Sequence, residues 1–176
     1  MSVPAKSERF QATVMPYLNS AFNLASWLTR NSNDAQDVTQ EACLRAFKFF
    51  DGFHGEDARS WLLAIVRNTF YTWYQENRGQ KGNASFDEEI HSLEAADAAY
   101  MEYMDNNPET LLARKDSERL LQQALDALPL EFREVIVLRE LEGLSYKQIA
   151  GIVGVPIGTV MSRLGRGRKL LAKMLA

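Results

Sequence analysis

Apolar residues recur at helical spacing over residues 8–77. Intervals of three and four residues put one set of them on a single helix face: Ala21, Leu24, Ala25 and Leu28. A second set at similar spacing comprises Val38, Ala42, Leu44 or Arg45, and Phe49. No window of the chain shows sustained alternation of apolar and polar residues, which is the pattern of a half-buried strand. The sequence therefore predicts an all-α fold.

Turn residues divide this region into separate helices. Asn33 or Asp34 is predicted to cap the helix that follows the polar turn at 31–34, because a side-chain oxygen there can accept from the free N–H groups of the first turn. Gly52 and Gly55 end that helix. A third helix, rich in aromatic residues, is predicted from residue 57 or 58 to 75, with 77–82 as its end.

Residues 81–108 are predicted to be an acidic flexible linker between two small helical domains, 1–80 and 109–176. The segment carries one basic and seven acidic residues, and its hydrophobic residues lack the spacing of a core. Glycine, asparagine and proline lie near its ends. So little apolar surface cannot offset the entropy lost on ordering the chain.

Residues 109–176 are predicted to form four helices. A leucine-rich stripe makes the first helix and ends at Pro129, and the second is predicted over 131–140. Two more are predicted at 145–153 and from 156 to about 175. The turn between the last two is so short that they form a helix-turn-helix, whose second helix can enter the major groove of DNA.

The helix-turn-helix contains the residue types that its geometry needs. Ser145 can cap the first helix, Gly154 can adopt a positive φ in the turn, and Pro156 suits the start of the second helix. Gly165 and Gly167 each cost about 1 kcal/mol of helix propensity relative to alanine, so the second helix is predicted to be soft beyond Leu164. The predicted buried face comprises Ile149, Ala150 and Val153 of the first helix and Val160, Leu164 and Leu171 of the second.

The net charge of −3 hides an uneven distribution along the chain. Residues 1–80 carry eight basic and eight acidic side chains, whereas residues 109–176 carry eleven basic and eight acidic ones. Residues 143–176 hold six basic residues and no acidic one. Such a block is typical of a nucleic-acid-binding element. A solvated basic helix, or a packed helical hairpin that never touches DNA, is also consistent with this composition.

Residues 128–146 and 158–164 carry a more specific signal. This stretch closely resembles the C-terminal domain of extracytoplasmic-function (ECF) sigma factors, which reads the −35 element of promoters. The resemblance implies that outward-facing side chains of the second helix contact that element. We call these residues the −35 set: Ile157, Thr159, Ser162, Arg163 and Arg166.

Residues 34–47 place Asp34, Asp37 and Glu41 at intervals of three and four, beside Gln40. This acidic stripe is consistent with a solvated helix face or with a carboxylate metal site, although no histidine lies in the segment. The segment also resembles the ECF helix that docks on the clamp coiled coil of the polymerase β′ subunit. The resemblance favours polymerase docking by these four residues, which we call the clamp set.

Residues 58–74 are rich in aromatic side chains and resemble the family's segment that reads and opens the −10 element. Opening a duplex exposes base faces on which aromatic rings can stack while an amide or a cation holds the strand. The resemblance implies a −10 set that comprises Arg67, Asn68, Tyr71 and Tyr74. We expect the remaining large residues of the segment, Trp61, Ile65 and Phe70, to belong to the core.

The resemblance covers nearly the whole chain and implies a transcription initiation factor. The expected partners are core RNA polymerase (the β′ clamp and the β subunit), promoter DNA and an anti-sigma factor. Three alternatives remain at this point: a helix-turn-helix regulator that acts without polymerase, a helical enzyme and a structural adaptor. The acidic stripe and the aromatic segment of the first domain argue against the regulator.

The sequence lacks the residues that several kinds of structural, catalytic and membrane-spanning feature need. Cys43 is the only cysteine, which excludes an internal disulfide framework and a thiolate metal cage. His54 and His91 lie in loop-like or linker contexts, and the chain has no glycine-rich phosphate loop or nucleophile elbow. There is no apolar run long enough to span a bilayer and no signal-peptide core. We therefore expect a cytoplasmic protein that is not an enzyme and that needs no cofactor or metal.

Overall fold

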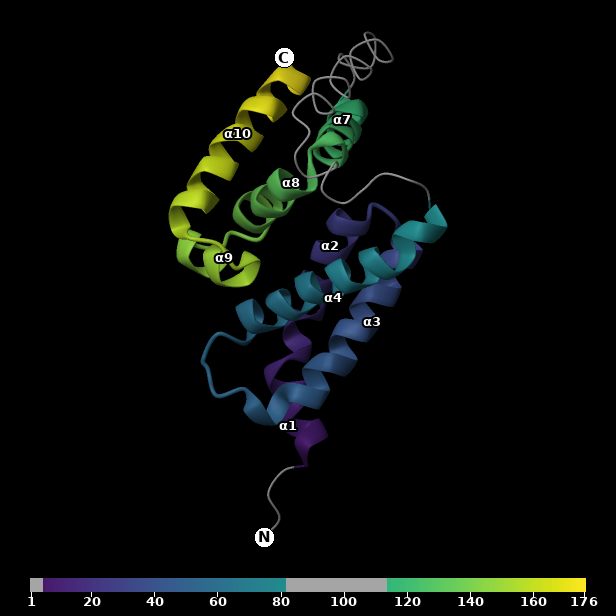
Figure 1. The fold of residues 1–176 in the computed structure, drawn as a ribbon, viewed down its shortest axis with the longest axis vertical. Helices are drawn as coiled ribbons and strands as arrows, with labels where there is room; N and C mark the ends of the chain where they lie inside the picture. The colour runs from purple at the N-terminus through teal and green to yellow at the C-terminus, as the bar shows by residue number, and fades with distance from the viewer. Residues whose placement is uncertain (1–4, 82–113) are drawn as a thin grey trace.

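The computed structural model describes residues 5–81 and 114–176, and every regular element within these two stretches is a helix (Figure 1). The all-α prediction is confirmed. Nearly all of the predicted linker, and the start of the leucine-rich stripe, lie outside the described residues. The N-terminal half, residues 5–81, contains α1 (Lys6–Thr13), η1 (Met15–Tyr17), α2 (Leu18–Thr29), α3 (Ser32–Phe49), η2 (Phe50–Gly52) and α4 (Ala58–Lys81). The C-terminal half, residues 114–176, contains α7 (Arg114–Ala127), α8 (Leu130–Ile136), the π-helical segment η4 (Val137–Leu141), α9 (Tyr146–Val153) and α10 (Ile157–Leu175).

Three helices, α2, α3 and α4, pack against one another to form the core of the N-terminal half. The first predicted apolar set, Ala21 to Leu28 on α2, is buried. On α3 the buried face continues from Ala42 to Ala46 and then to Phe50 of η2. Phe49, which the spacing grouped with Val38 and Ala42, is 59% exposed and does not share their buried face. The core position falls four residues after Ala46, and the neighbouring phenylalanine therefore points outward.

α3 begins earlier than predicted, with Asn31 as its N-cap in place of Asn33 or Asp34. Arg30 has a left-handed backbone (φ 58°) and ends α2. Asn31 is consequently already extended, and its side-chain oxygen accepts from the amide of Asp34 at 2.9 Å. The predicted cap at Asn33 or Asp34 was wrong because the left-handed turn reverses the chain before those residues are reached.

The aromatic helix α4 also runs further than predicted. The helix was expected to reach residue 75 and to be terminated by residues 77–82, but it continues through most of that segment to Lys81. The side-chain amide of Asn77 donates to the carbonyl of Trp73 at 2.8 Å, so this polar residue bonds back to its own helix and does not start a turn.

The helix-turn-helix forms as predicted, from α9 and α10. Ser145 and Gln148 make a reciprocal capping box at the start of α9. Gly154 adopts a φ of 73° in the turn, a conformation that disfavours any side chain. Val160 and Leu164 are buried, and Leu171 is half-buried beside the buried Leu170.

The second helix of the motif is continuous, contrary to the prediction that it is soft beyond Leu164. Gly167 is buried where α10 crosses α8. A β-carbon there would lie 3.0 Å from Cγ1 of Ile136 and 3.3 Å from Cβ of Phe132. This glycine is therefore required for close packing of the two helices. Gly165 is exposed and has open space around it.

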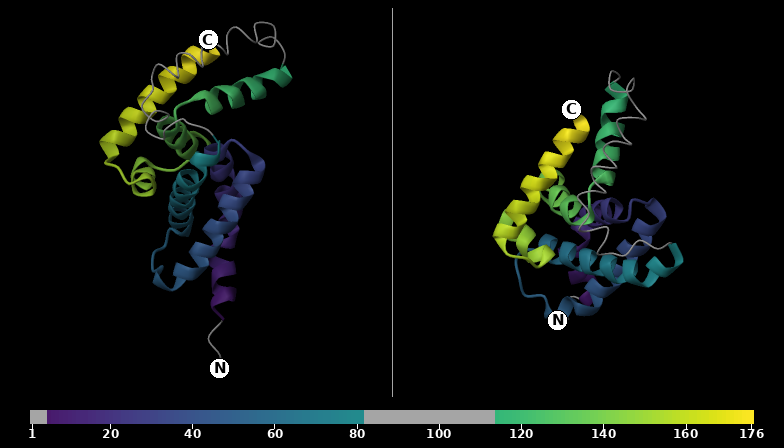
Figure 2. Two further views of the ribbon diagram at one scale, coloured as in Figure 1. Left: turned by 45° about the vertical axis from the view of Figure 1, so that its right-hand side comes forward. Right: turned by 45° about the horizontal axis from the view of Figure 1, so that its top comes forward.

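The two halves are in direct contact. α8 packs on α2, and α9 packs on α4, so that buried residues of both halves form one continuous cluster. Two turned views show the C-terminal half seated across α2 and α4, with α10 on its outer side (Figure 2). The arrangement brings α8 opposite the middle of the aromatic helix.

A matched pair of substitutions tests the packing role of Gly167. Gly167→Val is expected to destabilise the chain by about 1–3 kcal/mol, because the new side chain overpacks the crossing with α8. Gly165→Val meets open space and should be neutral or slightly stabilising. Urea unfolding measures both variants. Equal effects at the two positions would contradict the packing role of Gly167.

Candidate functional site

The −35 set lies on and near the outer face of α10. Ile157 is 44% exposed, and Ser162 and Arg166 are also exposed. Thr159 is half-buried near the helix start. Arg163 is half-buried too, and one of its nitrogens lies 3.8 Å from a carboxylate oxygen of Glu131 on α8. The outer face therefore presents three of the five predicted residues directly to solvent.

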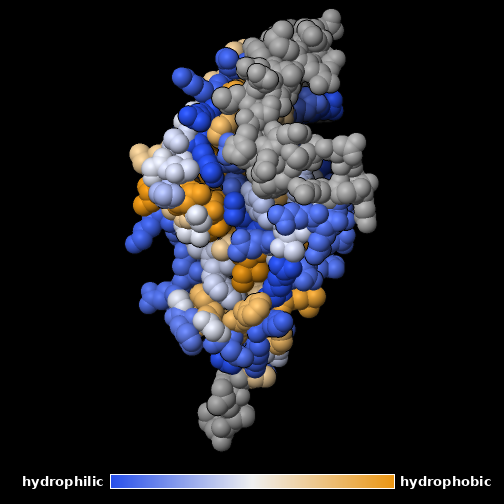
Figure 3. Space-filling view, viewed as in Figure 1, coloured by the Kyte–Doolittle hydropathy of each residue, from blue (hydrophilic) through white to orange (hydrophobic). Residues whose placement is uncertain are grey.

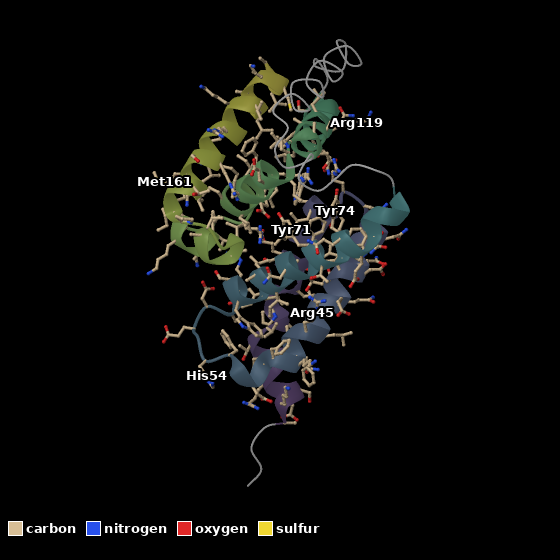
Figure 4. All side chains as sticks on the ribbon, in the orientation of Figure 1. Arg45, His54, Tyr71, Tyr74, Arg119 and Met161 are labelled. Carbon is tan, nitrogen blue, oxygen red and sulfur yellow. The ribbon has the colours of Figure 1, made fainter. Side chains whose placement is uncertain are left out.

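The −35 set omits one exposed apolar residue of this face. Met161 is 53% exposed and lies one helical turn after Ile157. An apolar patch is visible over the corner where α9 meets α10, and Met161 is labelled there (Figures 3 and 4). The spacing of four residues between two outward apolar side chains was the signal that could have revealed it.

Basic side chains extend along the same helix. Arg166, Lys169 and Lys173 are exposed. Arg168 donates to a carboxylate oxygen of Glu140 at 2.6 and 3.0 Å, and this contact raises the pKa of the guanidinium. The exposed helix thus combines an apolar patch at its start with positive charge along its length, as a helix that enters a DNA groove requires.

The clamp set lies on α3 in the N-terminal half. Asp37, Gln40 and Glu41 are exposed, whereas Asp34 is half-buried in the first turn. Glu41 accepts from the guanidinium of Arg45, one turn later, at 3.2 Å. The structure brings the set together on one helix, with its last three members open to a partner.

An apolar groove of about 750 Å³ adjoins the clamp set. On the α3 side it is lined by Gln40, Cys43, Leu44 and Phe47. Leu44 is 67% exposed and Phe47 is 38% exposed. The opposite wall comes from α1, η1 and α2 and comprises Phe10, Met15, Leu18, Asn19 and Phe22. The sequence alone does not reveal this groove, because its two walls come from segments that meet only in the fold.

The −10 set on α4 is divided by the fold. Asn68 is exposed. Tyr74 is half-buried, with its ring 5.8 Å from that of Phe70. Arg67 and Tyr71 instead face the C-terminal half, and Tyr71 is labelled between α4 and α8 (Figure 4). Phe70 is buried as expected, and Trp61 and Ile65 are half-buried against the core.

Arg67 and Tyr71 share one carboxylate. Glu134 of α8 is only 1% exposed. The guanidinium of Arg67 donates to both of its oxygens, from Nε at 2.9 Å and from Nη2 at 3.1 Å. The hydroxyl of Tyr71 donates to the same carboxylate at 2.9 Å. A fork-to-fork arrangement of this kind is among the strongest polar contacts that a protein makes.

The electrostatics of this cluster keep Arg67 charged and Tyr71 protonated. Burial alone disfavours a charged guanidinium, but the hydrogen bonds and the charge of Glu134 outweigh burial and raise the pKa of Arg67. Burial, followed by the neighbouring carboxylate, raises the pKa of Tyr71 far above its usual value. The hydroxyl consequently stays protonated and remains a donor to Glu134.

Further polar contacts join the two halves around this cluster. The buried guanidinium of Arg133 donates to the carbonyl of Trp27 at 2.9 Å. The side-chain amide of Gln148 donates to Asp57 at 2.9 Å, and Arg59 donates to the backbone carbonyl of Glu142. Each contact pairs a residue of one half with a residue of the other.

Among the described residues, no group of three or more histidine, cysteine, aspartate or glutamate side chains could hold a metal ion. None of the described helices is long and apolar enough to cross a membrane.

Comparison with known proteins identifies both halves. Residues 13–80 match the family model of Sigma-70 region 2, and residues 118–171 match that of Sigma-70, region 4. The clamp and −10 sets fall inside the first match, and the −35 set falls inside the second.

Whole-chain relatives agree with the two regional matches. The chain is 35% identical over 163 residues to the ECF RNA polymerase sigma factor SigE of Mycolicibacterium smegmatis, covering 93% of this chain and 60% of that longer relative. It is 32% identical over 163 residues to the ECF RNA polymerase sigma-E factor of Escherichia coli K12, covering 92% of this chain and 84% of the relative.

A solved structure has the same fold. The sigma factor RpoE of Bartonella quintana, crystallised with the anti-sigma factor NepR, superposes with a TM-score of 0.70 at 24% identity, over 96% of this chain and 97% of the other. Two regional matches in the family's order and a relative matched over most of its length lead to one conclusion: the chain belongs to the extracytoplasmic-function (ECF) family of RNA polymerase sigma factors.

Proposed function

We propose that this chain binds core RNA polymerase and directs it to promoters whose −35 element is read by α10 and whose −10 element is read and opened by α4. The observation that carries the proposal is the capped helix-turn-helix, whose second helix presents basic and apolar side chains with no acidic residue. The chain then acts in the cytoplasm, where the polymerase is, and contributes no catalysis of its own.

The chemistry of α10 suits base reading in the major groove. Arg166 can fork onto guanine O6 and N7 or hold a phosphate, and Ser162 can bond to either kind of group. Ile157 and Met161 offer apolar contact to a thymine methyl group. Arg163 becomes available once it leaves Glu131.

The surface of α3 suits docking on a protein. Asp37, Gln40 and Glu41 form a polar edge, and the groove beside them exposes Leu44 and Phe47. An apolar centre with a charged rim is the usual composition of a protein–protein interface. We assign this surface to the β′ clamp of core polymerase.

An anti-sigma factor is the third proposed partner. The Bartonella sigma factor of the same fold was crystallised with one. The exposed apolar surfaces on α3 and α10 are the places where such a partner would compete with polymerase and DNA.

Substitution of Arg166 tests −35 reading. Arg166→Ala is expected to weaken binding to a −35 duplex by about 1–3 kcal/mol if the side chain forks onto guanine, or by less and equally for all sequences if it holds phosphate. Arg168→Ala on the same helix is the matched control, because Arg168 is already paired with Glu140. Fluorescence anisotropy at several salt concentrations separates the two cases. Unchanged binding by an Arg163→Ala, Arg166→Ala double variant would contradict the assignment.

Charge reversal on α3 tests polymerase docking. Replacement of Asp37 and Glu41 by Lys should abolish association with core polymerase, because like charges meet across the interface wherever the partner is basic. Both residues are exposed, so the fold should survive. A pull-down on core polymerase measures association, with circular dichroism as the folding check. Glu56→Lys, an exposed acid off this helix, should bind normally. A folded double variant with wild-type affinity would refute the clamp assignment.

Removal of one amide tests −10 reading. Asn68→Ala should leave polymerase docking intact and impair opening of the promoter, because Asn68 is the exposed member of the −10 set and can bond to an unpaired base. Permanganate reactivity of unpaired thymines reports opening. Normal reactivity would give Asn68 a purely structural role.

A further inference from the structure

The first two turns of α10 carry large apolar side chains on their exposed face. Ile157 is 44% exposed, and Met161, one turn later, is 53% exposed. Met161 is labelled at the corner where α9 meets α10 (Figure 4). Two such side chains on adjacent turns form a patch, and an exposed apolar patch marks a place where a chain binds a ligand or partner.

Positive charge is absent from this end of the helix. Residues 157–162 contain no charged side chain. The first cation, Arg163, has a nitrogen 3.8 Å from a carboxylate oxygen of Glu131, and the first exposed one is Arg166. A helix-turn-helix places the first residues of its second helix against the base edges of the major groove. The surface that meets those edges is therefore apolar.

The base edges of the major groove carry one alkyl group, the methyl group on C5 of thymine. The other positions that distinguish the bases there are hydrogen-bond donors and acceptors. An apolar side chain placed against a donor or acceptor removes the water bound to that group and supplies no hydrogen bond, which costs free energy. Ile157 and Met161 therefore favour a base pair that presents a methyl group.

Gly158 gives a base edge access to this patch. The residue is exposed and lies beside Ile157 and Met161 on the helix surface. Apart from its chain neighbours and the backbone of its own helix, no atom of the described residues lies within 4 Å of the position that a β-carbon would take. Because glycine has no side chain, the space beside the two apolar residues stays open, and a base can approach the backbone closely there.

The polar neighbour of the patch suits more than one base. The hydroxyl of Ser162 donates to the carbonyl of Thr159 at 3.3 Å and keeps its lone pairs free to accept. It can accept from the amino group of cytosine, or turn and donate to O4 of thymine. Ser162 therefore does not separate the two pyrimidines, and the methyl group becomes the feature that does.

We propose that Ile157 and Met161 recognise the C5 methyl group of a pyrimidine in the −35 element, and that 5-methylcytosine can replace thymine at that position. The proposal deepens the assignment of α10 to −35 reading and rests on it. Its consequence is a promoter preference that responds to DNA modification: a promoter with cytosine at this position binds more tightly once that cytosine is methylated.

Removal of single methyl groups from DNA tests the contact. A promoter is first selected from a pool of sequences by transcription with core polymerase and this chain. Each thymine of its −35 duplex is then replaced in turn by uracil, which lacks only the methyl group. Burial of one methyl group corresponds to about a fourfold difference in affinity. Uracil at one position should weaken binding of the polymerase complex by about that factor, measured by competition between duplexes.

Variants of α10 assign the effect to the patch. The Ile157→Ala, Met161→Ala double variant should bind the thymine and uracil promoters equally, whereas Met161→Leu keeps an apolar side chain and should still distinguish them. Leu175→Ala is the matched control, because Leu175 is 40% exposed and lies at the far end of the same helix. It should distinguish the two promoters as wild type does. All of these residues are exposed, so the fold should survive, and circular dichroism checks it.

A second arm separates the two sources of the methyl group. The methyl-sensitive thymine is replaced by cytosine or by 5-methylcytosine, each paired with guanine. Cytosine should bind about as weakly as uracil, and 5-methylcytosine should restore most of the lost affinity. An element read through O4 of thymine would instead tolerate uracil and show no recovery with 5-methylcytosine.

Three results would overturn the proposal: a −35 duplex with no methyl-sensitive position, a folded double variant that still distinguishes thymine from uracil, or no recovery with 5-methylcytosine. Failure of the proposed function gives a different result, because the polymerase complex would then select no promoter from the pool.

Discussion

A buried carboxylate needs partners, and among the described residues Glu134 finds them in Arg67 and Tyr71 of the other half. Arg67 and Tyr71 satisfy both of its oxygens. Removal of one member of such a cluster leaves an uncompensated buried charge, which costs several kcal/mol. The neighbouring Arg133 is also buried and bonds to the carbonyl of Trp27 in α2. The position of α8 against α2 and α4 depends on these two adjacent charges, and the arrangement of the halves follows from it.

The same contacts connect structure with function. Apolar packing alone could hold the halves together without involving the side chains of α4 that are proposed to contact DNA. Here the polar contact uses two residues that the resemblance to sigma factors assigns to −10 DNA, Arg67 and Tyr71. The −35 face of α10 is largely exposed, as is the clamp set on α3.

Features that are encoded locally could be predicted from the sequence. Ser145, Gln148 and Gly154 specify the helix-turn-helix through bonds and torsions within ten residues, and these were confirmed. Features that depend on distant segments could not be predicted. The pairing of Arg67 with Glu134 joins residues 67 positions apart, and neither residue has a local pattern that indicates it. The helix-breaking tendency of Gly167 was similarly outweighed by its contact with α8.

The function of this chain as a sigma factor is tested most directly by transcription in vitro with purified core polymerase, the chain and a pool of promoter sequences. Transcripts should depend on the chain and should start only from templates that share one −35 and one −10 element at fixed spacing. Binding of the chain to DNA without association with core polymerase, and without promoter-specific transcripts, would contradict it.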